Sequence, residues 1–315
     1  MNIEPKKHPI FDGIEMGMGT WAWGDRYYWG YGQHYHRDDI HAAFRYAVEK
    51  GIIFFDTAEA YGMGQSETML GEFAREAGKT IRIASKFFPF PWRLNKRALL
   101  RALRGSLKRL GIDKLSLYQM HHPYPPVNIR IWMNAMGEAL EAGLVEAIGV
   151  SNYDRSQMQE AYDALTAEGL QLASNQVEFH LLSRRAEKDG LIQHCQELGI
   201  TVIAYSPLAS GVLPGKYSAE HLPSGFRNGR YNRHVLTEIK PLLDVLKKIG
   251  ADHAGKSAGQ VAINWTICKG TLPIPGGKNL QQVGQNFDST GWRLTDEEVE
   301  RLDAISDKVL AVLGW

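Results

Sequence analysis

Short apolar segments with strand character recur along this chain at a nearly constant spacing. They begin near residues 52, 81, 115, 145, 172 and 201, so successive starts lie 29, 34, 30, 27 and 29 residues apart. Each interval has room for one β-strand, one helix and two loops, and amphipathic helical patterns occupy these intervals. The spacing predicts a chain of parallel strands that alternate with helices.

The helical patterns have recognisable ends. Segment 37–50 carries apolar side chains at i, i+3, i+4 and i+7, and Gly51 follows it as a stop. A basic helix begins after Asn95, a capping residue, and ends at Gly111. Other helices are expected at 66–76, 131–142, 156–167, 187–198 and 257–268. Further strands at 13–19 and 271–274 bring the count to eight, which predicts an α/β fold of the (β/α)8 TIM barrel type in one domain, residues 1–315.

A doubly wound open sheet is the alternative fold. It would need a glycine-rich phosphate-binding turn that opens a helix after the first strand. The sequence GMGTWA at 17–22 lacks the third glycine and does not open a helix, so the barrel is the better interpretation. The interval from the strand at 201 to the strand at 271 is about 40 residues longer than the repeat. The surplus, mainly 208–233, predicts a long functional loop after the seventh strand.

The composition excludes several classes of protein. Lys and Arg number 36 against 35 for Asp and Glu, which gives no electrostatic reason to expect a nucleic-acid partner. Two cysteines, Cys195 and Cys268, are too few for a disulfide framework or a Cys-rich metal site, and we expect no metal. The apolar runs are far shorter than the about 20 residues that span a bilayer, and segment 1–7 is polar. We therefore expect a cytoplasmic protein without a membrane partner; no heptad pattern indicates an oligomeric state.

Ionisable side chains follow the apolar strands where a barrel builds its active site, at the carboxyl ends of the strands. Asp56, Lys86 and His121 each adjoin a strand end, and Tyr61 follows Asp56 by five residues. Singly, each has an ordinary structural explanation, such as a turn cap, surface packing or a solvated charge. Together they adjoin strand ends that point to the same end of the barrel. Burying an unpaired charge there would cost several kcal/mol, so Asp56 and Lys86 are expected to pair.

This set of side chains suits protonation of a carbonyl oxygen while a hydride arrives at its carbon. An ammonium near a phenol favours the phenolate, so Lys86 is expected to lower the pKa of Tyr61 and make it a proton donor. A neutral His121 could orient the substrate oxygen. An aldolase that uses Lys86 as a Schiff-base nucleophile is the alternative, but it needs a neutral amine, which Asp56 disfavours.

Seven sequence blocks, in order, resemble those of the aldo-keto reductase family. They are FDTAEAYG at 55–62, ASK at 84–86, LYQMH at 117–121, GVSN at 149–152, NQVE at 175–178, YSPL at 205–208 and IPGG at 274–277. The resemblance extends from residue 17 to residue 286. It implies an NADP(H)-dependent oxidoreductase that reduces small aldehydes and ketones to alcohols on a (β/α)8 barrel. It also implies that Asp56, Tyr61, Lys86 and His121 form the catalytic tetrad.

The resemblance implies cofactor contacts at three places. Ser151, Asn152 and Gln176 would hold the nicotinamide carboxamide, and Tyr205 would stack on the nicotinamide ring. The segment after Tyr205 would line the pyrophosphate through Ser206, Leu208, Ser210 and Gly211. Pro275, Gly276, Gly277 and Lys278 lead into a helix expected to begin near Asn279, and a helix N-terminus beside a lysine forms an anion site. In similar sequences this segment, with Gln282 and Asn286, binds the adenosine and its 2′-phosphate; the alternative is a simple tight turn at Gly276 and Gly277.

The sequence departs from the best-known branch of the family at the adenosine end. That branch has a lysine-serine pair in place of Gly276 and Gly277 and an arginine in place of Gln282, so this chain resembles the Pro-Gly branch. We expect NADP(H) through Lys278, with NAD(H) less favoured. His122 stands where many relatives carry a tryptophan, and we expect it to pack or to line the pocket. Some similar proteins are regulatory subunits that bind the cofactor with little turnover, and this is the alternative function.

Aromatic residues crowd two loops at the expected mouth. One cluster follows the first strand, and the other follows Lys86. From the first we predict Trp21 as a substrate-pocket residue, and from the second Phe87, although most such rings pack loops onto the barrel rim. A pocket of this kind would favour aromatic or aliphatic aldehydes over highly charged sugars.

Overall fold

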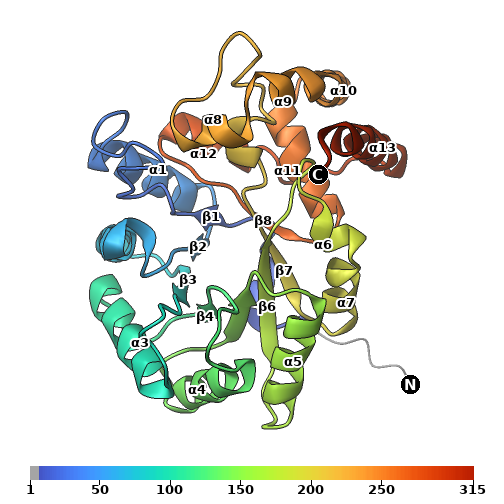
Figure 1. Cartoon of the computed structure of the whole chain (residues 1–315). Coiled ribbons are helices and arrows are strands. Elements are labelled where there is room, and N and C mark those ends of the chain that lie inside the picture. The colour runs from blue at the N-terminus through green and yellow to red at the C-terminus, as the bar shows by residue number, and fades with distance from the viewer. Residues whose placement is uncertain (1–6) are drawn as a thin grey trace.

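The computed structural model describes residues 7–315, so the polar start considered above lies, apart from Lys7, outside the described residues. Eight parallel strands pair in chain order within one sheet (Figure 1). Their bounds are β1 (Met18–Gly19), β2 (Phe54–Asp56), β3 (Arg82–Phe87), β4 (Leu117–Met120), β5 (Ile148–Ser151), β6 (Leu172–Glu178), β7 (Thr201–Tyr205) and β8 (Leu272–Ile274).

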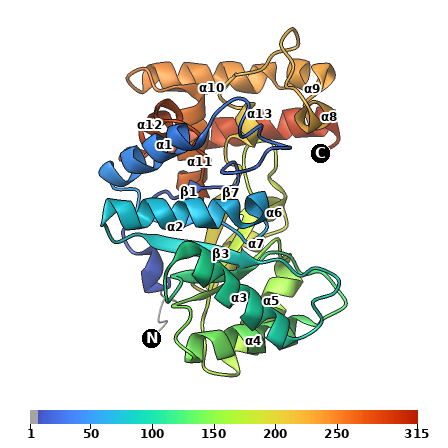
Figure 2. The ribbon, with the colours of Figure 1, turned by 90° about the vertical axis from the view of Figure 1, so that its left-hand side faces the viewer.

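Helices lie around the outside of these strands (Figures 1 and 2). After β1 to β5 they are α1 (Arg37–Glu49), α2 (Gln65–Ala77), α3 (Lys96–Leu110), α4 (Ile129–Glu141) and α5 (Arg155–Thr166). After β6 and β7 they are α6 (Arg185–Lys188), α7 (Leu191–Glu197), α8 (Phe226–Arg230), α9 (Arg233–Glu238), α10 (Lys240–Asp252) and α11 (Ala258–Cys268). The last two are α12 (Leu280–Phe287) and α13 (Asp296–Leu313).

The first and last strands meet, which closes the sheet. The backbone N–H of Gly17 donates to the carbonyl of Pro273 at 3.0 Å, and that of Gly19 donates to Pro275 at 3.1 Å. The predicted (β/α)8 barrel is confirmed. The first strand is much shorter than the predicted 13–19, because only Met18 and Gly19 pair with β2.

A separate apolar cluster packs inside the barrel. Each strand from β2 to β8 except β5 contributes to this cluster, which includes Phe54, Leu117 and Ile203. Ile10 and Phe11 also belong to it. The latter two belong to the short helix η1 (Pro9–Phe11), which lies behind β6 and β7 in Figure 1. The strand residues of this cluster precede Asp56 in β2 and Lys86 in β3, so η1 closes the amino end of the barrel. The carboxyl ends of the strands face the viewer in Figure 1.

One predicted helix is broken in two. The pattern at 187–198 predicts a single helix, but α6 ends at Lys188 and α7 begins at Leu191. Gly190, with φ of 72°, adopts the left-handed conformation between them, which glycine reaches without steric cost. The apolar periodicity continues across this break, so the sequence pattern did not reveal that the helix is divided.

The long excursion after β7 is present as predicted, but short helices occupy part of it. The 3₁₀ turn η3 (Ala209–Gly211), α8 and α9 lie between β7 and α10. Buried Tyr217 and Tyr231 anchor this segment. In Figure 2 the loop after β1 reaches toward α8, and the Arg227 guanidinium lies 5.4 Å from the centre of the Trp29 ring. No helix within residues 7–315 is both long and apolar enough to cross a membrane.

Candidate active site

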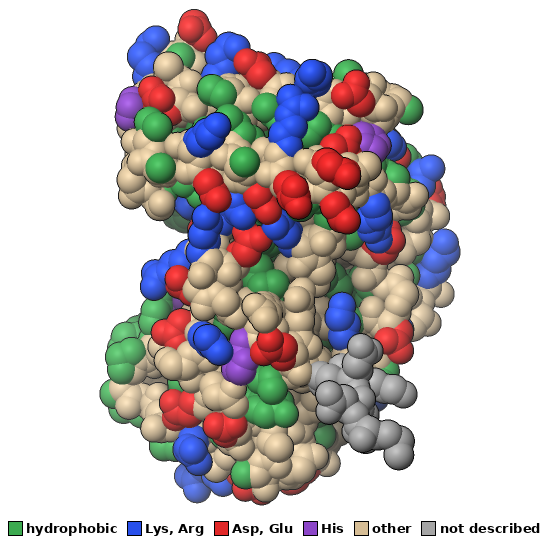
Figure 3. All heavy atoms as spheres, turned by 90° about the vertical axis from the view of Figure 1, so that its right-hand side faces the viewer, with side chains coloured by type: hydrophobic (Ala, Val, Ile, Leu, Met, Phe, Trp, Pro, Cys, Tyr) green, Lys and Arg blue, Asp and Glu red, His purple; other side chains and the backbone are tan. Residues whose placement is uncertain are grey.

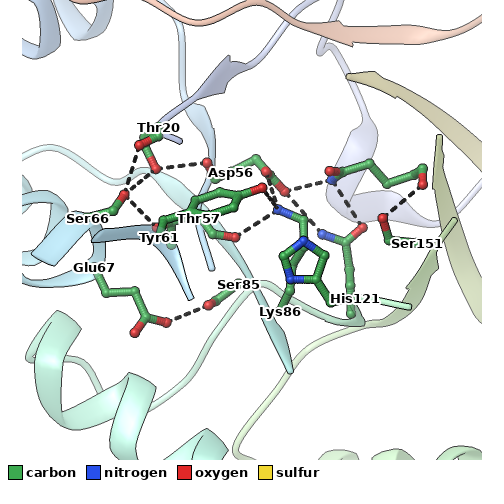
Figure 4. A network of polar contacts seen from close by, with 12 residues as sticks. Thr20, Asp56, Thr57, Tyr61, Ser66, Glu67, Ser85, Lys86, His121 and Ser151 are labelled. Atoms are coloured by element: carbon green, nitrogen blue, oxygen red, sulfur yellow. Dashed lines mark hydrogen bonds and ion pairs between the residues drawn. The ribbon is translucent and has the colours of Figure 1, made fainter. Parts of the chain in front are cut away.

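Three of the predicted catalytic side chains lie at the carboxyl ends of adjacent strands. Asp56 ends β2, Lys86 is the penultimate residue of β3, and His121 directly follows β4. Tyr61 lies in η2 (Tyr61–Gly64), the 3₁₀ turn between β2 and α2. Because neighbouring parallel strands end at the same edge, the four side chains come together (Figure 4). In Figure 3 the molecule is deeply indented at its left edge, the side that faces the viewer in Figure 1.

Lys86 is the centre of this group. Its side chain is 0% exposed, and its Nζ donates to Asp56 Oδ2 at 2.5 Å, to the Thr57 carbonyl at 2.9 Å and to the Tyr61 hydroxyl at 3.2 Å. All three hydrogens of the ammonium therefore have an acceptor. The expected pairing of Asp56 with Lys86 is confirmed.

Asp56 is held from its other side by two amides. Gln176 Nε2 donates to Asp56 Oδ1 at 2.7 Å, and Gln119 Nε2 donates to the same oxygen at 3.2 Å. Both amides are buried, so one carboxylate oxygen meets amides while the other meets the ammonium. Sequence reasoning missed Gln119. The sequence did carry a signal for it. Gln119 lies two residues before His121, and alternate residues of a strand face the same side, so both side chains could be expected to face the barrel interior.

The electrostatics of Tyr61 differ from the expectation. Burial raises the pKa of the Tyr61 phenol, and this outweighs the lowering by Lys86. The prediction that the lysine lowers the tyrosine pKa overall is therefore wrong, because the sequence could not show the desolvation. Burial by itself lowers the pKa of Lys86, but Asp56 and Tyr61 raise it more, so the net pKa is above its usual value. At neutral pH the phenol keeps its proton beside a charged ammonium.

The turn that carries Tyr61 is anchored by buried hydroxyls. Ser66, in α2, donates to the Thr20 carbonyl at 3.0 Å, and its oxygen lies 2.7 Å from Thr20 Oγ1 and 2.9 Å from Thr57 Oγ1. Thr20 Oγ1 also donates to the Asp56 carbonyl at 3.0 Å. These contacts join β1, β2 and α2 around the Tyr61 turn (Figure 4).

His121 lies edge-on to Tyr61. Their ring centres are 5.8 Å apart, with planes at 80°. Burial, with contributions from Lys86 and His122, holds the pKa of His121 well below its usual value, so the ring is neutral, as expected. Its Nδ1 is buried without a hydrogen-bond partner among the described residues. Its backbone carbonyl accepts from Asn152 Nδ2 at 3.0 Å, which joins it to the predicted cofactor residues.

The predicted carboxamide residues and Tyr205 form one connected group. The Tyr205 hydroxyl donates to Asn152 Oδ1 at 3.0 Å, and Asn152 Nδ2 donates to Ser151 Oγ at 3.1 Å. Ser151 Oγ donates to the Gln176 carbonyl at 2.9 Å. The structure thus brings these four residues together, next to His121. The Gln176 amide nitrogen, however, is engaged with Asp56.

The predicted pyrophosphate segment has unusual backbone geometry. Ser206 and Ser210 have φ values of 54° and 56°, Ala209 between them has 48°, and Gly211 has 92°. Asn152, which follows β5, has 62°. Left-handed conformations are uncommon for residues other than glycine and tend to gather at functional sites. Leu208 is half-buried beside this turn.

The end of β8 leads into a helix, as predicted. Asn279 caps α12 by accepting from the Gln282 N–H at 3.0 Å, and Gln282 Oε1 accepts from the Lys278 N–H at 3.0 Å. Asn286 Nδ2 donates to the Gly276 carbonyl at 3.1 Å. A Cβ on Gly277 would lie 2.6 Å from Val283 Cγ2, so this glycine permits close packing. Gln282 and Asn286 therefore shape the turn after Pro275 with their own side chains.

Three cations converge beside this turn. Lys278 Nζ lies 4.8 Å from the centre of the Trp29 ring and 4.9 Å from that of Tyr35. Arg227 lies against Trp29 and Tyr217, and Lys216 lies 5.5 Å from the Tyr217 ring. Burial, with Lys216 and Arg227, lowers the pKa of Lys278 to about 8. Within residues 7–315 no carboxylate forms an ion pair with any of the three. Sequence reasoning identified Lys278 but missed Lys216 and Arg227, which only the folding of the β7 loop brings here.

One of the two predicted pocket residues is misplaced. Trp21 is 37% exposed and its ring centre lies 6.3 Å from that of Tyr61, which puts it at the mouth. Phe87 is 0% exposed and packs on Trp132 of α4. Because strand residues alternate in direction, Lys86 faces the interior and Phe87 the helices. The neighbouring Phe88 faces the site instead, 5.4 Å from His121 between ring centres.

Comparisons with known proteins agree with this geometry. The sequence profile of the aldo/keto reductase family matches residues 15–307. The chain is 44% identical over 301 residues to a chloroplastic pyridoxal reductase of Arabidopsis thaliana, with 91% of this chain and 82% of that protein covered.

Two solved structures have the same architecture. An aldo/keto reductase from Klebsiella pneumoniae, solved with NADP and acetate, is 30% identical with a TM-score of 0.72, covering 93% of this chain and 91% of that one. A glycerol dehydrogenase from Gluconobacter oxydans has a TM-score of 0.83 over 99% of this chain and 96% of its own, and at 24% identity it shows the fold alone. Together with the profile match, these similarities establish that the chain is an enzyme of the aldo/keto reductase family.

Proposed function

We propose that this protein reduces aldehydes and ketones to alcohols with NADP(H), and that Tyr61 is the proton donor. The observation that carries the proposal is the contact between the Tyr61 hydroxyl and Lys86 Nζ, at 3.2 Å, beside the ring of a neutral His121. The group contains a proton donor, a fixed positive charge and a second hydrogen-bonding ring. It offers no free nucleophile, because Lys86 is held charged by Asp56.

The chemistry follows from this arrangement. NADPH, when bound, supplies the hydride that reaches the carbonyl carbon. Tyr61 gives its O–H proton to the carbonyl oxygen as negative charge develops there, and Lys86 stabilises the phenolate that Tyr61 becomes. Asp56 keeps Lys86 charged throughout. His121 Nε2 donates a hydrogen bond to the same carbonyl oxygen and so orients the substrate.

The three cations at the adenosine end support NADP(H). A lysine, an arginine and a second lysine crowd together without a carboxylate, and Arg227 Nε is buried without a partner in the described chain. Such a cluster is stabilised by an anion. We propose that Lys278, with Arg227 and Lys216, holds the 2′-phosphate, while the segment Ser206–Gly211 lines the pyrophosphate. The NADP complex of the Klebsiella relative supports NADP(H) as the cofactor.

The nicotinamide end is proposed from the group around Asn152. Ser151, Asn152 and Gln176 offer amide and hydroxyl groups at fixed positions, and Tyr205 presents its ring beside them. We propose that these residues hold the carboxamide and support one face of the nicotinamide. Gln176 would do so with its Oε1, since its nitrogen is held by Asp56.

The substrate class is proposed from the aromatic residues at the mouth. Trp21 and Phe88 line the approach to Tyr61, and such surroundings favour aromatic or aliphatic aldehydes over charged sugars. The similarity to a pyridoxal reductase supports the same class and makes pyridoxal a substrate to test.

The test is an assay of NADPH oxidation with benzaldehyde, an aliphatic aldehyde of similar size, pyridoxal and a sugar phosphate. We expect turnover of the first three and little turnover of the fourth. Tight NADPH binding with no turnover on any substrate would instead indicate a regulatory subunit that binds the cofactor. Comparable turnover of the sugar phosphate would contradict the proposed substrate class.

A further inference from the structure

The loop after β4 carries a column of parallel rings that begins at the catalytic site. The His121 and His122 rings have centres 5.0 Å apart and planes 8° apart. The rings of His122 and Tyr124 follow, at 4.5 Å and 2°. Phe88 lies edge-on along the column, 5.7 Å from His122 and 6.1 Å from Tyr124. The column leads from His121 outward to Tyr124, which is 46% exposed.

A second group of aromatic rings, on the loop after β1, also contacts Tyr61. Trp21 stacks on Tyr28 with ring centres 4.9 Å apart, and Trp21 also contacts Tyr61. Tyr61 contacts His121 of the column as well. The space at Tyr61 is therefore bordered by aromatic rings of two loops. A flat ring fits such a space with its faces or edges against other rings.

Beyond His121, the column carries hydrogen-bonding groups on His122 and Tyr124 that are unpaired within the described chain, and His122 is the one next to His121. Its ring is half-buried, and neither ring nitrogen has a hydrogen-bond partner among residues 7–315. Burial and the charge of Lys86 lower the pKa of His122, so at neutral pH the ring offers one N–H donor and one acceptor. No carboxylate of the described chain forms an ion pair with it.

We propose that His122 determines substrate specificity by hydrogen bonding to a polar ring substituent, a hydroxyl group or a ring nitrogen, of a planar aromatic aldehyde whose carbonyl lies at Tyr61. This proposal rests on the proposed carbonyl reduction and adds the residue that selects among aromatic substrates. Two imidazoles with centres 5.0 Å apart can contact two polar groups of one small ring, so His121 holds the carbonyl oxygen while His122 holds the second group. An unsubstituted ring leaves His122 without a partner.

The test measures kcat/KM for benzaldehyde and for the three hydroxybenzaldehyde isomers. It does so in wild type, His122→Phe and His122→Gln. Phenylalanine keeps a stacked ring but has no ring nitrogens, whereas glutamine keeps a donor and an acceptor. We expect wild type to prefer one hydroxylated isomer over benzaldehyde in kcat/KM. In His122→Phe that preference should fall about three- to tenfold, mainly through KM, as expected for one hydrogen bond. His122→Gln should restore part of it.

A matched control is available on α1. His41 also stacks on an aromatic ring, that of Phe73, at 4.6 Å, but it lies away from the mouth. In His41→Phe, the ratio of kcat/KM for the preferred hydroxylated isomer to kcat/KM for benzaldehyde should stay as in wild type. An equal loss for all four substrates in His122→Phe, or no isomer preference in wild type, would overturn the role of His122. Failure of wild type to oxidise NADPH with any aldehyde would overturn the proposed function itself.

Discussion

Lys86 Nζ lies 3.2 Å from the Tyr61 hydroxyl and donates a hydrogen bond to it. Since the ammonium is also bound by Asp56, its charge is maintained in a fully buried position. A phenol is protonated at neutral pH, and burial raises the pKa of Tyr61 further above its usual value. In the proposed reaction, the charge of Lys86 would stabilise the phenolate that Tyr61 becomes after it gives up its proton.

Replacing the phenol hydroxyl tests the proton donor. Tyr61→Phe keeps the ring against Trp21 and His121 but removes the O–H group. We expect kcat to fall about 10² to 10⁴-fold, the usual contribution of a general acid. NADPH affinity, measured by fluorescence titration, should change little, because the predicted phosphate contacts lie elsewhere. An unchanged kcat would rule out the assignment.

The carboxylate partner of Lys86 is expected to control the alkaline limit of activity. Asp56 raises the pKa of Lys86 against the effect of burial. In Asp56→Asn the effect of burial dominates, so the pKa of Lys86 falls. The variant should therefore lose the ammonium charge at a lower pH than wild type does. The alkaline limb of the kcat profile should therefore move down by about one pH unit or more.

Gln119→Met is the matched control for that variant. It removes one donor to Asp56 Oδ1 but leaves the carboxylate and the Lys86 pair in place. Its alkaline limb should stay closer to that of wild type, and its stability should fall by about 1–3 kcal/mol, measured by urea unfolding. A profile of Asp56→Asn that superimposes on wild type would contradict the role given to the pair.

NADPH binding is expected to weaken above pH 8. The pKa of Lys278 is about 8, so the lysine is charged below this pH and neutral above it. A phosphate favours the charged form, so binding takes up a proton and the Kd for NADPH rises up to about tenfold per pH unit once the lysine is neutral. Trp29, 4.8 Å from Lys278 Nζ, provides a fluorescence readout.

Two controls separate this effect from general alkaline damage. NADH, which lacks the 2′-phosphate, should bind with little dependence on pH in this range. Lys278→Met should lower NADPH affinity at pH 7 and abolish its pH dependence. Equal pH dependence for NADH and NADPH would remove Lys278 from the 2′-phosphate site.

Phe87 and Phe88 form a pair of adjacent residues with opposite expected effects. Phe87→Ala empties a site packed against Trp132, so it should lower the free energy of unfolding by about 3–5 kcal/mol. Phe88→Ala removes a ring beside His121 and His122, so it should chiefly raise KM for aromatic aldehydes. Denaturant unfolding and steady-state kinetics on both variants check this, and the reverse pattern would place Phe87 in the pocket after all.

The sequence alone was sufficient to predict the barrel and to predict that the candidate catalytic side chains lie together. A repeat of about 30 residues with buried strands admits few architectures, and parallel strands bring their carboxyl ends to one edge. Asp56, Lys86 and His121 could be placed together for that reason. The start of a helix near Asn279 could be predicted as well, because helix ends depend on residues close in sequence.

Only the tertiary structure decided which neighbours each of these side chains meets. The pKa of Tyr61 depends on how much water the surrounding residues exclude, and the site of Phe87 depends on which face of β3 its register presents. Arg227 and Lys216 reach Lys278 through the loop after β7, whose path no local pattern encodes. Periodicity and capping act over a few residues, whereas desolvation and charge clustering act between segments far apart in the chain, so they exist only in the folded protein.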